Sequence, residues 1–180
     1  MGAATILHFG IGERGVSVAT RYIARVAFLF FWLTYTGGAL STLFGSSFAG
    51  LGRRRRELGL AFAAALLVHL AFVAWLFRIA ARQPISDMWI VYFALGAVCA
   101  YALAAGSLKR FGAVLHTRVG RIFSTIAIEY IAFLFFRDFV LLPLQFGARH
   151  PLEYAPFALL IIVGPLLRWS VMARRWQITS

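Results

Sequence analysis

The chain has 180 residues, of which 62% are hydrophobic and only 13% are charged, and its formal net charge is +12. A water-soluble domain of this length cannot bury so large an apolar fraction, because a single core hides only part of its surface. The composition therefore predicts a protein surrounded by lipid. The positive charges lie between apolar stretches and not in a groove with stacking aromatic residues, so nucleic-acid binding is a poor explanation of the charge.

Five stretches are long and apolar enough to cross a bilayer core as helices, which takes about 20 residues each. In chain order they are 22–44, 58–77, 88–106, 119–136 and 154–172. The last stretch reaches residue 172 only if Arg168 extends its guanidinium group towards the membrane surface. The sequence thus predicts an all-α fold, an integral membrane helical bundle of five transmembrane helices.

The spans are predicted to form a single transmembrane bundle over residues 22–176, and two segments are expected to lie outside them. The first is a short N-terminal tail, residues 1–21. The segment FVLLPLQFGARHP, between the fourth and fifth spans, is apolar but contains Pro143 and Gly147. Because proline and glycine interrupt helices, it is expected to be an interfacial loop.

The basic residues are divided unequally between the two sides of a five-span bundle. The side of the N-terminus has seven basic residues, whereas the other side has eleven and a single acidic residue, Glu57. The eleven are Arg53, Arg54, Arg55, Arg56, Lys109, Arg110, Arg118, Arg121, Arg168, Arg174 and Arg175. The positive-inside rule makes this second side cytoplasmic. We therefore expect a multi-pass protein of a bacterial-type inner membrane, with the N-terminus outside and the C-terminus in the cytoplasm.

Four polar residues fall inside or next to the predicted spans: His69 in the second, His116 before the fourth, and Glu129 and Tyr130 in the fourth. An ionisable group in hydrocarbon costs about 2.5–3.5 kcal/mol on insertion scales, so it marks a function or a buried partner. At 1.5 Å per residue, His69 lies about 18 Å from the arginine-rich boundary of its span, and Glu129 about 12 Å from the opposite boundary. The two groups are therefore expected to lie at one depth and to face each other.

This expected pair has a structural and a functional interpretation. In the first, His69 and Glu129 form a hydrogen bond that fastens two helices together. In the second, His69 ligates a metal or a haem iron, a common reason for a neutral imidazole inside a helical bundle. Spacing alone does not choose between them, and His69 with Glu129 would leave a metal short of ligands.

Three blocks carry a family resemblance. RRELGLAFAAALLVHLAF places His69 ten residues after Gly59, KRFGAVLHTRVGRIFSTIAIEYIAFLFF contains Leu115 and His116, and ALLIIVGPLLRWSVMARR lies near the C-terminus. In this order, over 20–176, they resemble the ferric reductase-like transmembrane family. The resemblance is closest to the haem-binding membrane subunit of the periplasmic methionine sulfoxide reductase system. In that family, the histidine that follows Leu-Gly-Leu ligates a haem.

The resemblance implies a b-type haem held by His69, with His116 matching a second histidine of the family. It implies electron transfer from a cytoplasmic quinol or flavin donor to an acceptor or partner protein outside. Arg118 and Arg121 become candidate partners of the haem propionates, although ordinary positive-inside charge explains them equally well. Nothing in the sequence resembles a flavin or nicotinamide domain, so the chain would be the electron-transfer subunit of an oxidoreductase with a separate reductase partner.

The chain departs from the family at the other ligands. Thirteen residues after His116, where the family has the histidine that completes the axial pair, stands Glu129, followed by Tyr130. Arg55 stands where other ferric reductases have a further histidine, and the first of the family's six spans has no counterpart. His116 is expected two to three turns shallower than His69, so these two do not pair. The remaining options are Tyr130 as second ligand, a five-coordinate haem on His69, or a haem-free scaffold or assembly subunit.

Overall fold

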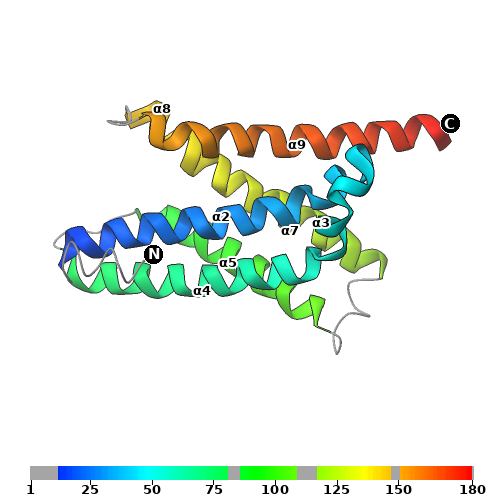
Figure 1. The fold of residues 1–180 in the computed structure, drawn as a ribbon. Coiled ribbons are helices and arrows are strands. Elements are labelled where there is room, and N and C mark those ends of the chain that lie inside the picture. Colours follow the sequence, from blue (N-terminus) through cyan, green and yellow to red (C-terminus); the bar gives the residue numbers. More distant parts are fainter. Residues whose placement is uncertain (1–11, 81–85, 109–116, 147–150, 180) are drawn as a thin grey trace.

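The computed structural model describes residues 12–80, 86–108, 117–146 and 151–179, and the regular structure in these ranges is helical. The predicted all-α fold is confirmed. The helices are α2 Glu13–Phe44, η1 Gly45–Phe48, α3 Ala49–Arg53, α4 Arg55–Ile79, α5 Asp87–Ser107, α7 Arg118–Phe136, η2 Arg137–Leu141, α8 Leu142–Phe146 and α9 Pro151–Thr179. Figure 1 shows α9, α2 and α4 as nearly parallel rods, which α5 and α7 cross obliquely.

Helix α2 is the element around which the others pack. Its buried residues recur at three- and four-residue spacing, as at Ala27, Phe28, Phe31 and Tyr35, and this spacing lines up one face of a helix. The most extensive contact of α2 is with α4, and α2 also touches α9 and α3. Residues 13–21, which were expected to belong to a tail, form the beginning of α2, and Val16 is fully buried there.

A tight reversal at the end of α2 brings α3 back against it. Gly45 ends α2 with a φ of 64°, a conformation that favours glycine. A Cβ atom on Gly37 would lie 3.4 Å from the carbonyl oxygen of Leu51, so the backbones of α2 and α3 lie close together. The end of α2, α3 and the start of α4 thus form one end of the bundle, which we call the arginine-rich end because it carries Arg53–Arg56 (Figure 1).

Helix α7 does not end at the charged pair Arg137 and Asp138 but continues through the π-helical η2 into α8. The prediction of an interfacial loop from Phe139 onwards is therefore wrong as far as Phe146, and residues 147–150 lie outside the described ranges. In η2 the Leu142 amide donates to the carbonyl of Arg137, a five-residue spacing in place of four. Pro143, which has no amide hydrogen to donate, follows directly after this wider turn.

Four described helical segments are long and apolar enough to cross a membrane: Glu13–Arg53, Arg55–Ile79, Asp87–Ser107 and Glu153–Arg174. Helix α7 is not among these four. Large apolar side chains project outwards from every long helix, including Leu67, Val98, Ile126 and Leu159, each at least 61% exposed. Water does not accommodate so much apolar surface, so the helices suit contact with a lipid bilayer.

Candidate functional site

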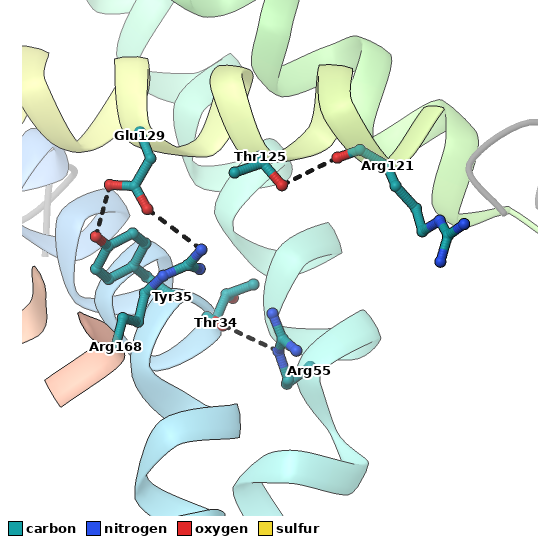
Figure 2. Close-up of polar contacts among 7 residues, drawn as sticks. All are labelled: Thr34, Tyr35, Arg55, Arg121, Thr125, Glu129 and Arg168. Atoms are coloured by element: carbon teal, nitrogen blue, oxygen red, sulfur yellow. Dashed lines mark hydrogen bonds and ion pairs between the residues drawn. The ribbon is translucent and has the colours of Figure 1, made fainter. Parts of the chain in front are cut away.

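The most connected polar cluster joins three helices near the arginine-rich end (Figure 2). The hydroxyl of Tyr35 on α2 donates a hydrogen bond of 2.8 Å to Glu129 Oε2 on α7. Arg168 Nη2 on α9 lies 3.2 Å from the other carboxylate oxygen, Glu129 Oε1. The Arg168 guanidinium also lies over the Tyr35 ring, 4.5 Å from its centroid, as in a cation–π contact. Each oxygen of the carboxylate therefore has a donor from a different helix.

A cleft of about 220 Å³ opens beside this cluster, and Arg55 lies on its other side. The Arg55 Nε donates a 3.2 Å hydrogen bond to the backbone carbonyl of Thr34, so α4 is tied to α2 at this level. Gly38 makes room for this side chain, because a Cβ atom there would lie 3.1 Å from Arg55 Nη1. Figure 2 shows Arg168 and Arg55 on the same side of α7, the side towards which Glu129 extends.

His69 lies elsewhere, against the beginning of α2. Its Nδ1 is 3.2 Å from the backbone carbonyl oxygen of Thr20. Because a carbonyl oxygen only accepts, Nδ1 carries the proton and Nε2 keeps its lone pair. This hydrogen bond fastens α4 to α2. Within the described residues, it is the hydrogen bond that the His69 side chain forms.

The predicted depth match between His69 and Glu129 is wrong. His69 is level with Thr20 and Glu129 is level with Tyr35, and these two positions on α2 are about 22 Å apart at 1.5 Å per residue. The hydrogen bond expected between His69 and Glu129 is therefore not formed. The prediction counts residues from Arg137 as the outer boundary of the fourth span. In the structure the helix continues past it, and its guanidinium lies 3.4 Å from the centroid of the Trp89 ring.

The other predicted site residues are not brought to His69 either. Tyr130 faces α5 and donates a 3.0 Å hydrogen bond to the carbonyl of Tyr92. Arg118 and Arg121 begin α7 with exposed side chains. His116, the second predicted metal ligand, lies outside the described residues. Within the described ranges, no group of three or more His, Cys, Asp or Glu side chains is placed to hold a metal ion.

Two residues of the cluster, Tyr35 and Arg168, and the neighbouring Arg55 are not among the site residues predicted from the sequence. Arg168 was expected to extend to the membrane surface, Arg55 was noted only as a replaced histidine, and Tyr35 was overlooked. A signal for Tyr35 was present, because Thr34, Tyr35 and Thr36 interrupt an otherwise apolar stretch of α2. The threonine hydroxyls donate to carbonyls one turn back in their own helix, so only the tyrosine needs a partner from another helix.

As a haem ligand set, the described residues supply one imidazole and not a pair. His69 fits a single axial ligand, because a carbonyl holds Nδ1 and leaves Nε2 for a metal, the usual arrangement of a ligating histidine. Glu129 and Tyr130 do not fit as its axial partner, since both are engaged elsewhere. Comparison with known proteins adds nothing to this geometry: no family model, no curated protein and no solved structure matches the chain.

Proposed function

We propose that the chain is a five-span membrane protein that holds a b-type haem on His69 and serves as the electron-transfer subunit of an oxidoreductase. The observation that carries this proposal is the hydrogen bond from His69 Nδ1 to the carbonyl of Thr20. Such a bond fixes the tautomer and the orientation of the ring and makes Nε2 a better ligand. The resemblance of the sequence around His69 to the ferric reductase-like family supports the same assignment.

The proposed topology adds α7 to the four long apolar segments, so that α7 crosses the membrane as the fourth of five spans. Helix α7 is almost as long as α5, and its charged Glu129 is partnered by Arg168, which lowers the cost of placing it at membrane depth. With the arginine-rich end in the cytoplasm, His69 lies nearer the outer surface, on the side of the expected acceptor or partner protein. A bound haem would supply the one-electron chemistry, and the donor would be a quinol or a flavin on a partner.

The topology predicts an outer N-terminus and a cytoplasmic C-terminus. Alkaline phosphatase fused to the C-terminus is therefore expected to be inactive, whereas green fluorescent protein at the same position is expected to fluoresce. Fusions in the α4–α5 connection should behave in the opposite way. An active C-terminal phosphatase fusion would contradict either the orientation or the number of spans, and the fusions in the α4–α5 connection would show which.

The haem assignment predicts a coloured protein. The full chain, purified in detergent after expression with ample haem, is expected to show a Soret band that His69→Ala abolishes and Leu67→Ala preserves. Leu67 is the matched control because it lies on the same helix and is 61% exposed. Added imidazole should restore the band in His69→Gly, because the free ligand replaces the lost one. Haem without a Cys-x-x-Cys-His motif is non-covalent, so acid acetone should extract it.

A haem-free membrane scaffold or assembly subunit is the second candidate. The ion pair between Glu129 and Arg168 favours it. Glu129 stands where the family has its second haem-ligating histidine, and here this carboxylate has a structural partner instead. In this case His69 only fastens α4 to α2. A wild-type protein that stays colourless despite ample haem would overturn the haem proposal in favour of this one.

A further inference from the structure

The cleft at the arginine-rich end contains more positive charge than its own residues neutralise. Arg168 has a carboxylate partner, Glu129, at 3.2 Å, but Arg55 donates its hydrogen bond to the neutral backbone carbonyl of Thr34. No described carboxylate pairs with Arg55. Both guanidinium groups line the same cleft. A cleft lined by two arginines, of which only Arg168 has a carboxylate partner among the described residues, is therefore an electrostatic site for an anion.

The lining of the cleft is both polar and apolar. Arg55, Arg168 and Thr42 contribute polar groups to the lining, and Ala39, Val171 and Met172 contribute apolar side chains. Met172 is 50% exposed, so the apolar lining continues onto the outer surface of α9. In a membrane, that surface is where lipid chains lie. The cleft thus offers both charged and apolar groups to one amphipathic ligand.

We infer that this cleft binds the phosphate group of an anionic lipid headgroup, with the guanidinium of Arg55 as the principal contact and that of Arg168 as the second. Guanidinium groups present paired N–H donors that match phosphate oxygens, and such charge-assisted hydrogen bonds are stronger than neutral ones. Basic pockets between membrane helices at their charged ends are suited to lipid headgroups. The inference does not depend on the haem proposal, because His69 lies at the other end of α2.

The test compares two arginines of the same run. The purified full chain in a neutral detergent is titrated with short-chain phosphatidylglycerol, and bound lipid is counted by native mass spectrometry, with phosphatidylcholine as the neutral reference lipid. Arg55→Gln is expected to weaken phosphatidylglycerol binding about tenfold, the effect of losing a charge-assisted contact. Arg56→Gln is the matched control, since Arg55 and Arg56 are both exposed but only Arg55 lines the cleft, and it is expected to bind within about twofold of wild type.

A second variant fills the cleft without changing a charge. Gly38→Ala places a methyl group close to Arg55 Nη1, and alanine suits the interior of α2 better than glycine, so the helix should remain intact. It is also expected to weaken binding of phosphatidylglycerol. Equal weakening by Arg55→Gln and Arg56→Gln would overturn the inference in favour of a diffuse positive surface. Inorganic phosphate that displaces the lipid at equal concentration would overturn the lipid as the ligand and indicate a site for free phosphate.

Discussion

Glu129→Gln is expected to lower the free energy of unfolding by about 2 kcal/mol, because it leaves the guanidinium of Arg168 without its carboxylate. Removing one partner of a fully buried ion pair costs about 3–5 kcal/mol. The expected loss is smaller here because the pair is only partly buried: the side chain of Arg168 is 18% exposed and that of Glu129 is 36% exposed. Glutamine retains the size of the side chain and an acceptor for the Tyr35 hydroxyl, so the measured loss reports mainly on the charge.

Unfolding by sodium dodecyl sulfate in mixed micelles measures this change. Thr125→Ala is the matched control on the same helix, one turn earlier, because the Thr125 hydroxyl bonds only to the carbonyl of Arg121 in α7 itself. Its expected loss is below about 0.5 kcal/mol. Combining Glu129→Gln with Arg168→Met should recover most of the stability, because the unpaired guanidinium is then gone. If the double variant is as unstable as the sum of the single ones, the ion pair is not the cause.

The helices themselves were largely predictable. The spans expected at 58–77, 88–106 and 119–136 lie within or match the helices Arg55–Ile79, Asp87–Ser107 and Arg118–Phe136. A long apolar run has few alternatives, because every backbone group in lipid must be hydrogen-bonded within its own segment. The ends were less predictable where helix continues beyond the apolar run, as in α9, which extends to Thr179.

The candidate site was much less predictable, because it depends on how neighbouring helices are aligned along their axes. The expected depth of Glu129 assumes that Arg137 lies at the membrane surface, and the expected end of the last span assumes the same of Arg168. In the structure Arg137 lies over the Trp89 ring of α5 and Arg168 pairs with Glu129 of α7, so each guanidinium group is engaged by a neighbouring helix. Sequence spacing identified Glu129 as a residue that needs a partner but could not identify the partner, because Tyr35 and Arg168 come from distant parts of the chain.

The second large loss of stability is expected when Phe28, in the aromatic core of the bundle, is truncated. This side chain is fully buried, and its ring lies 4.9–5.9 Å from those of Phe135, Phe139 and Phe157. It therefore connects α2 with α7, η2 and α9. Phe28→Ala is expected to lower the free energy of unfolding by about 3 kcal/mol, at the low end of the range for such truncations. The reason is that in a membrane the lost energy is packing against protein and not transfer out of water.

The neighbouring residue is the control for that variant. Leu29 is 42% exposed on the same turn of α2, so Leu29→Ala removes a side chain that lipid can replace, and the expected loss is below about 0.5 kcal/mol. Both variants are compared by detergent unfolding at the same protein concentration. A large loss in Leu29→Ala with little loss in Phe28→Ala would mean that the lipid-facing and core-facing sides of α2 are interchanged. The helix would then be rotated, and Tyr35, two turns further along the Phe28 face, would point away from Glu129.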